Sequence, residues 1–241
     1  DHLVAISEYV KETIVKKYNL TANNISVINR GIDTKYFNQP VDSTRRDQVV
    51  TTHQIDTAKK IILFPARMTS WKGQLEFIDV IKKMDTQNIL VLFVGDTKNE
   101  SYTKIVRDKI YQNNLKNICK ILGSINQDEM RSLYQIADLS VSFPLRAEGF
   151  GRTISESLYS NTPVLAFDYG GVKNQLENLS NLFKIKPHDY QAIPSKIEEI
   201  LSLTKNHQKE VLQEAKSVID KNFSKINMLN QYMKLYESFK F

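Results

Sequence analysis

The chain has 241 residues, of which 41% are hydrophobic and 25% charged, and its net charge is +6 at pH 7. This length and composition suit one sizeable globular core, or one and a half domains. Lysines and arginines are spread along the chain without a basic block interleaved with aromatics, which argues against a nucleic-acid-binding protein. The single cysteine, Cys119, excludes an intramolecular disulfide, and no apolar stretch is long enough to span a membrane.

The first 37 residues predict a strand, a helix and a second strand. The strands lie at residues 3–6 and 25–28, and Ser7 caps the helix between them. Residues 38–58 are polar and have no clear period, so they predict a linker with a short helix at residues 43–53. Because the chain opens directly in an apolar segment without an initiating Met, we interpret it as a fragment or a processed chain.

From residue 60 onward, apolar strands alternate with helices. The expected strands are at residues 61–66, 89–94, 118–122, 139–143, 164–167 and 182–185. The expected helices are at residues 72–84, 100–113, 127–136, 152–160 and 172–178, with two or three more after residue 189. Nearly all-apolar strands separated by helices predict an α/β fold, with a Rossmann-like parallel sheet covered by helices on both faces. Ligands bind such sheets at the carboxyl ends of the strands.

The most informative segment follows the strand predicted at residues 139–143. Glu148 and Glu156 are eight positions apart, and we place Glu148 in a loop and Glu156 inside the helix that this loop opens. Free amide groups at such a helix start form an anion site, and glycine lets backbone approach a ligand closely. The residues between the carboxylates are Gly149, Phe150, Gly151, Arg152 and Thr153. Carboxylates for sugar hydroxyls and amides for phosphate together predict a nucleotide-sugar site.

A second basic segment follows the strand predicted at residues 61–66. Arg67 and Lys72 are separated by four residues across a strand-to-helix turn. Two fixed cations can stabilise the negative charge that develops on a diphosphate leaving group, without a metal. A lysine at a helix start opposes the helix dipole, which favours an anionic partner over a purely structural role.

These segments resemble the family 4 retaining glycosyltransferases, which have the two-domain GT-B fold. Glu148 and Glu156 match the Glu-x7-Glu motif of that family, and Arg67 and Lys72 match the pair that grips the donor diphosphate. The resemblance covers the C-terminal, donor-binding half of the GT-B fold and a short stub of the acceptor-binding half. The domain boundaries that it implies are a stub at residues 1–37, a linker at 38–58, a donor-binding domain at 59–222 and a C-terminal helix at 223–241 that returns toward the N-terminal domain.

The resemblance also implies roles for the charged residues. Arg67, Lys72 and Glu148 would be the catalytic residues, because the cations stabilise the leaving group and Glu148 contacts the transferred sugar. Glu156 would hold the ribose hydroxyls of the nucleotide. No general base is expected on this chain, since the family's histidine near the reaction centre belongs to the missing domain.

Three further residues would contact the donor through their backbone. Ile125 would lie against the base, and Gly170 and Gly171 would line the path of the donor phosphate or sugar. Asn174 stands where the family often has a glutamate, and this departure leaves the donor sugar open.

The implied function is the transfer of a hexose, from GDP-mannose or a UDP-hexose, to a saccharide or lipid-linked acceptor with retention. The pathways that fit are lipopolysaccharide, capsule or glycolipid synthesis, and the acceptor would bind through the missing domain. No cofactor or metal is implied, because the nucleotide-sugar is a substrate. We expect this fragment alone to be inactive and the protein to be cytoplasmic, with peripheral contact at the inner face of the membrane left open. The alternatives are a nucleotide-sugar 2-epimerase and a non-catalytic nucleotide-sugar-binding domain.

The stub at residues 1–37 lacks the neighbours that its strands have in the family. Unpaired strand edges and bare apolar faces are costly. We therefore expect the stub to pair with a second copy or to fold back on the donor-binding region, with the C-terminal helix near it.

Overall fold

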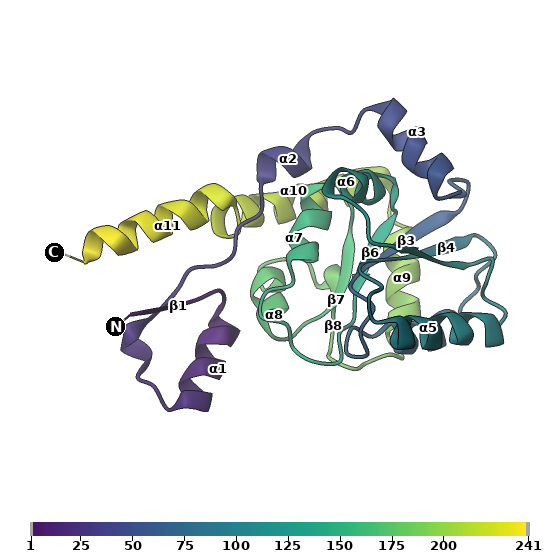
Figure 1. Cartoon of the computed structure of the whole chain (residues 1–241). Coiled ribbons are helices and arrows are strands. Elements are labelled where there is room, and N and C mark those ends of the chain that lie inside the picture. The colour runs from purple at the N-terminus through teal and green to yellow at the C-terminus, as the bar shows by residue number, and fades with distance from the viewer. Residues whose placement is uncertain (1, 240–241) are drawn as a thin grey trace.

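The computed structural model describes residues 2–239, which form two parallel sheets and the helices around them (Figure 1). The larger sheet has six strands in the order β5-β4-β3-β6-β7-β8. These strands are β3 (Lys60–Pro65), β4 (Ile89–Val94), β5 (Cys119–Gly123), β6 (Leu139–Ser142), β7 (Val164–Phe167) and β8 (Lys184–Ile185). The smaller sheet pairs β1 (Leu3–Ala5) with β2 (Ile25–Val27).

Helices cover both faces of the six-stranded sheet, which confirms the predicted α/β, Rossmann-like fold. They are α4 (Gln74–Ile81), α5 (Glu100–Gln112), α6 (Gln127–Ile136), α7 (Arg152–Tyr159), α8 (Gly171–Leu176), α9 (Ile193–Leu201) and α10 (Lys205–Asn222). Every residue of β4 and β7 is buried, as expected for strands that are packed on both sides. Phe64 of β3 joins the layers, because its ring lies 5.4 Å from those of Phe77 and Phe93.

The order of the strands reverses between β3 and β6. The chain runs outward from β3 through β4 to β5, returns to β6 beside β3, and then continues through β7 to β8 in the other direction. Right-handed crossovers place the helices of these two runs on opposite faces of the sheet. The crossovers after β3 and β6 therefore lead away to opposite faces, and open α/β sheets bind ligands at the carboxyl ends of the strands beside such a point.

Two predicted elements differ from the structure. The helix expected at residues 72–84 begins only at Gln74, because Gly73 has a φ of +86° and ends the preceding loop as the N-cap. Lys72 therefore lies in the loop before the cap and not in the first turn of the helix. The strand expected at residues 182–185 is shortened to β8, since Ser180 caps a 3-10 helix, η2 (Asn181–Phe183), that takes up its first half.

The N-terminal segment has the predicted strand–helix–strand order. Helix α1 (Glu8–Tyr18) begins at Ser7, whose hydroxyl accepts a hydrogen bond from the Val10 amide, and a 3-10 turn, η1 (Ala22–Asn24), precedes β2. Helix α2 (Thr34–Asn38) lies at the end of the N-terminal segment and adds to the predicted elements. Helix α3 (Ser43–Thr52) lies in the linker and confirms the short helix expected at residues 43–53.

The N-terminal segment folds back on the larger part of the chain, which is one of its two expected arrangements. The Ser7 hydroxyl donates a 2.6 Å hydrogen bond to the carbonyl of Gly149. The C-terminal helix α11 (Lys225–Ser238) lies near this segment, as expected: Ile32 pairs with Ser224 just before α11, and the ring of His2 packs edge-on against Phe239 at 5.4 Å (Figure 1). The domain boundaries stay a prediction.

Gly73 offers a test of how tightly the two central loops pack. A Cβ at this position would lie 2.0 Å from the carbonyl oxygen of Phe143, at the end of β6. Gly123 is a matched control, because it has a similar φ of +78° but no atom within 4 Å of the position of a Cβ. We expect Gly123→Ala to lower the free energy of unfolding by about 1–2 kcal/mol, which is the cost of the left-handed backbone alone.

Gly73→Ala should cost more, about 3 kcal/mol, because backbone strain and a clash add together. Denaturant unfolding of both variants measures the difference. Equal losses would mean that the β3–α4 loop can move away from β6.

Candidate functional site

The loops after β3 and β6 meet across the point where the strand order reverses. The Leu145 amide donates a 2.7 Å hydrogen bond to the Trp71 carbonyl and ties the loops together. The Lys72 ammonium forms an ion pair of 2.7 Å with the Glu148 carboxylate, and both side chains are largely buried, at 14% and 16% exposed. The Lys72 nitrogen also lies 4.5 Å from the centre of the Trp71 ring. The structure thus joins two predicted catalytic residues that are 76 positions apart.

Arg67, the third residue of the predicted catalytic set, is exposed at the start of the β3–α4 loop. The buried side chain of Gln74 donates a 2.9 Å hydrogen bond to the Arg67 carbonyl, and the Tyr102 hydroxyl holds the other end of the Gln74 amide at 3.2 Å. No ion pair involves the Arg67 guanidinium within residues 2–239. Its charge is therefore available to an anion, whereas that of Lys72 is already matched by Glu148.

Glu156 is on α7, as predicted, and is almost completely buried. One carboxylate oxygen pairs with the Arg152 guanidinium at 2.7 Å, and the other accepts a 3.1 Å hydrogen bond from the Tyr134 hydroxyl. Burial raises the pKa of the Glu156 carboxyl, although Arg152 and Tyr134 both favour the ionised form. Burial and the neighbouring carboxylate also raise the pKa of Tyr134 well above its usual value, so this hydroxyl remains a donor.

A pocket of about 380 Å³ lies at the carboxyl ends of β3, β4 and β5. The predicted site residues that line it are Arg67, Ile125, Arg152, Thr153 and Glu156. Strand-end residues, the Phe37 ring and Tyr134 complete the wall. An open pocket lined by a buried carboxylate and two arginines suits a ligand with both hydroxyl and anionic groups.

The remaining predicted residues lie beside this pocket and not on its wall. They are Lys72, Glu148, Gly149, Phe150, Gly151, Gly170 and Gly171. The Phe150 side chain is buried against Phe223, with ring centres 5.8 Å apart, so only its backbone is available to a ligand.

Gly170 and Gly171 pack directly against the Glu148 loop. The Gly171 amide donates a 2.7 Å hydrogen bond to the Glu148 carbonyl, and a Cβ on Gly171 would lie 2.1 Å from the Gly149 oxygen. The glycine pair therefore allows the close approach of α8 to this loop, whatever further role it has toward a ligand.

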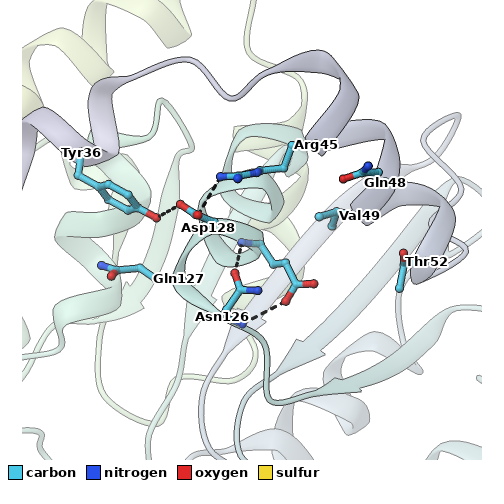
Figure 2. Close-up of a pocket in the computed structure, with 9 residues that line it drawn as sticks. Tyr36, Arg45, Gln48, Val49, Thr52, Asn126, Gln127 and Asp128 are labelled. Carbon is cyan, nitrogen blue, oxygen red and sulfur yellow. Dashed lines mark hydrogen bonds and ion pairs between the residues drawn. The ribbon is translucent and has the colours of Figure 1, made fainter.

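A larger pocket, of about 620 Å³, lies between α3 and the start of α6 (Figure 2). Its charged groups satisfy one another: Asp128 forms an ion pair of 2.8 Å with Arg45 and accepts a hydrogen bond from the Tyr36 hydroxyl, as the dashed lines in Figure 2 show. Asn126 and Glu129 are engaged in the capping box of α6. The larger pocket adjoins the smaller one through Asn126 and Gln127, but no predicted site residue lines the larger pocket. The smaller pocket is therefore the better candidate site.

Sequence reasoning missed two residues that the structure places at the site. Tyr134 contacts Glu156, and Gln175 of α8 contacts the backbone of the loop before α7. The only signal in the sequence is a side chain with a polar tip on the buried face of a predicted helix. That signal does not reveal a partner more than twenty residues away.

Two further properties concern residues 2–239. No group of three or more His, Cys, Asp or Glu side chains is placed to hold a metal ion. The helices in this range are too short or too polar to cross a membrane.

Residues 46–218, which are most of the chain, match the family model described as glycosyl transferases group 1. This chain belongs to that family. An uncharacterised glycosyltransferase of Methanocaldococcus jannaschii is 23% identical over 236 residues, which are 98% of this chain and 59% of that protein. A trehalose synthase of Thermococcus litoralis is 25% identical over 250 residues, covering 99% of this chain and 57% of that protein.

Solved structures share the fold of this chain over nearly its full length. A glycosyltransferase from Rickettsia africae superposes with a TM-score of 0.92 at 29% identity, over 99% of this chain and 63% of that one. An Anabaena protein crystallised with UDP-glucose has a TM-score of 0.85 at 22% identity, over 98% of this chain and 64% of that one. The fold is therefore the Rossmann-like half of a GT-B glycosyltransferase. The chain spans less than two thirds of the length of these relatives.

The raised pKa of Glu156 predicts a pH-dependent stability. Below the usual glutamate pKa of 4.5, this carboxyl is protonated in both the folded and the unfolded chain and burial adds no penalty. As the pH rises above 4.5, the unfolded chain ionises first, so the free energy of unfolding falls until the folded chain has ionised as well. Glu156→Gln removes this loss, because glutamine stays neutral and its oxygen can still accept the hydrogen bond of Tyr134.

We expect Glu156→Gln to have a higher melting temperature than the parent chain at about pH 8 and a smaller advantage at about pH 5. Calorimetry at the two pH values measures this, with the exposed Glu214→Gln on α10 as the control for loss of a carboxylate. A variant that is less stable by the same amount at both pH values would show that the Arg152 pair outweighs burial.

Proposed function

We propose that the complete protein is a retaining family 4 glycosyltransferase, which moves a hexose from a nucleotide-sugar to a saccharide or lipid-linked acceptor. This chain would supply the donor-binding half. The observation that carries the proposal is the position of the Lys72–Glu148 pair, at the point where the strand order reverses and beside the pocket that holds Arg67 and Glu156. Membership of the glycosyl transferases group 1 family supports it.

The geometry suggests how the donor lies. The nucleoside would occupy the pocket, with the Glu156 carboxylate accepting hydrogen bonds from the ribose hydroxyls and the backbone near Ile125 against the base. The diphosphate would then reach Arg67, the amides that open α7 and the Lys72 ammonium. These groups would stabilise the charge that the leaving diphosphate develops, so the reaction is proposed to need no metal.

The ion pair between Lys72 and Glu148 would change when the donor binds. A diphosphate beside Lys72 competes with the Glu148 carboxylate for the same ammonium group. Release of the carboxylate would free it to accept hydrogen bonds from the hydroxyls of the transferred sugar. Glu148 would thus be held ready in the empty site and would bind sugar only when the diphosphate is in place.

Our proposals for the donor, the acceptor and the pathway are based on the ligands and activities of similar proteins. The Anabaena structures contain UDP, or UDP with glucose, or UDP-glucose. An O-antigen chain mannosyltransferase of Salmonella typhimurium is 26% identical over 204 residues, which are 84% of this chain and 51% of that protein. A UDP-hexose or GDP-mannose donor and a role in lipopolysaccharide synthesis fit these relatives. The inactivity of this fragment alone, its cytoplasmic location and its contact with a membrane stay predictions.

Arg67→Ala tests the diphosphate site. Because it removes a charge-assisted contact worth about 1.5–3 kcal/mol, we expect affinity for a nucleoside diphosphate to fall about tenfold or more, with little change for the nucleoside. Titration calorimetry with UDP, GDP and the matching nucleosides measures both. Arg107→Ala, on the exposed side of α5, is the control for loss of one positive charge. Equal losses for nucleoside and diphosphate would refute the assignment.

Substitution of the two carboxylates should affect the binding of different ligands. Glu156→Gln should lower the affinity for nucleotides with an intact ribose and leave the affinity for their 2′,3′-dideoxy forms almost unchanged. Glu148→Gln should weaken the sugar-nucleotide by about tenfold but spare or tighten the free diphosphate, because it releases Lys72. Calorimetry with UDP, dideoxy-UDP and UDP-glucose, and with the guanosine series, distinguishes these outcomes. The reverse pattern would mean that the two roles are exchanged.

A further inference from the structure

The loop that carries Glu148 has four consecutive carbonyl groups that each accept a hydrogen bond from another segment or from the next helix. The Glu148 carbonyl accepts from the Gly171 amide at 2.7 Å, and the Gly149 carbonyl accepts from the Ser7 hydroxyl at 2.6 Å. The carbonyls of Phe150 and Gly151 both accept from the side-chain amide of Gln175, the second at 3.2 Å. The orientation of each peptide in this loop is therefore fixed by a defined partner.

Gln175 is buried, at 2% exposed, and its amide group is fully used. Its nitrogen donates to the two loop carbonyls, and its oxygen accepts a hydrogen bond from the Ser155 hydroxyl of α7. The two loop carbonyls fix which end of the amide faces the loop, because a carbonyl only accepts and must therefore meet the nitrogen, which leaves the oxygen to the Ser155 hydroxyl. Gln175 thus presents two donors to the loop in a single orientation.

The trans peptide bond turns this contact into a constraint on the amides. In a trans peptide, the carbonyl and the following N–H point in opposite directions. Since Gln175 holds the carbonyls of Phe150 and Gly151 toward α8, the N–H groups of Gly151 and Arg152 point away from α8. Arg152 and Thr153 line the pocket, whereas Gln175 does not.

We propose that Gln175 is a positioning residue, which orients the amides that open α7 to receive the donor diphosphate. This inference rests on the proposed function and assigns Gln175 no contact with the donor. Without the two side-chain donors, the peptides after Phe150 and Gly151 lose the contacts that hold them in one orientation. The Gly151 carbonyl would keep only the Ile154 amide, at 3.1 Å, and the Phe150 carbonyl would keep none of its present bonds.

The test is Gln175→Met, which keeps the length of the side chain and removes both donors. Ser157→Ala is the matched control, because it removes a buried 3.1 Å hydrogen bond to the Thr162 carbonyl at the other end of α7. Titration calorimetry with UDP, GDP and the matching nucleosides is carried out on the full 241-residue chain and on both variants. Thermal unfolding of each variant measures how much stability it loses relative to the parent chain, so that the two losses can be compared.

We expect Gln175→Met to lower the affinity for a nucleoside diphosphate by about tenfold and the affinity for the nucleoside by less than about twofold. Ser157→Ala should lose about as much stability as Gln175→Met, but both of its affinities should stay within about twofold of those of the parent chain. If Gln175→Met fails to fold, Gln175→Asn, which keeps the amide but shortens its reach, should show the same selective loss. Unchanged diphosphate affinity, or equal losses for both ligands, in the variant that folds overturns the proposal. Failure of the parent chain to bind any diphosphate would instead refute the proposed function.

Discussion

The reversal of strand order between β3 and β6 is the constraint on which the rest of the site depends. Two neighbouring parallel strands whose crossovers run to opposite sides leave their carboxyl ends uncovered by either crossover helix, and here the loops that follow these strands pack against each other. Lys72 and Glu148 connect the two loops with a largely buried ion pair. The desolvation of a largely buried charge pair is costly, and the removal of either partner leaves the other charge buried and unpaired. It is therefore a poor source of stability, and an anion that approached Lys72 would compete with the Glu148 carboxylate for the same ammonium group.

Loops that border a buried crevice need partners for their backbone groups, and two buried glutamines supply them here. Gln74 holds the Arg67 carbonyl in the loop after β3, and Gln175 holds two carbonyls in the loop after β6. Each glutamine is in turn fixed by a hydroxyl, from Tyr102 or from Ser155. Because unpaired buried carbonyls are expensive, these amides restrict the loops to one conformation without closing the crevice. In the loop after β3, the amide on the opposite side of the held peptide is itself used, because Met68 donates a 2.8 Å hydrogen bond to the Asp96 carbonyl. The amides proposed for a ligand are therefore those of Gly151 and Arg152 in the loop after β6.

The elements that the sequence predicts best are those whose signals are local. Helix α6 has the expected bounds because Asn126 and Glu129 form a capping box, and β4 and β7 are continuous apolar runs between polar turns. The predicted start of α4 is two residues too early, because Gly73 takes a left-handed conformation and packs against Phe143, which is 70 positions away. The pairing of Lys72 with Glu148 and the contacts of Tyr134 and Gln175 could not be predicted for the same reason. Motif spacing places residues at strand ends, but it does not show which of them touch.

Glu156 shows how stability and ligand recognition oppose each other at this site. Its carboxylate is buried deeply enough to raise its pKa, although an arginine and a tyrosine both stabilise the charged form. A neutral side chain would cost the empty protein less, so the fold alone does not account for a glutamate there. A carboxylate is, however, a stronger acceptor for hydroxyl donors than a neutral amide, and its hydrogen bonds are stronger where it is largely buried than in water. The Tyr134 hydroxyl holds the carboxylate in place, and the Tyr134 ring packs against Phe37 of α2. Phe37 also lines the pocket, so the N-terminal segment contributes to the pocket directly.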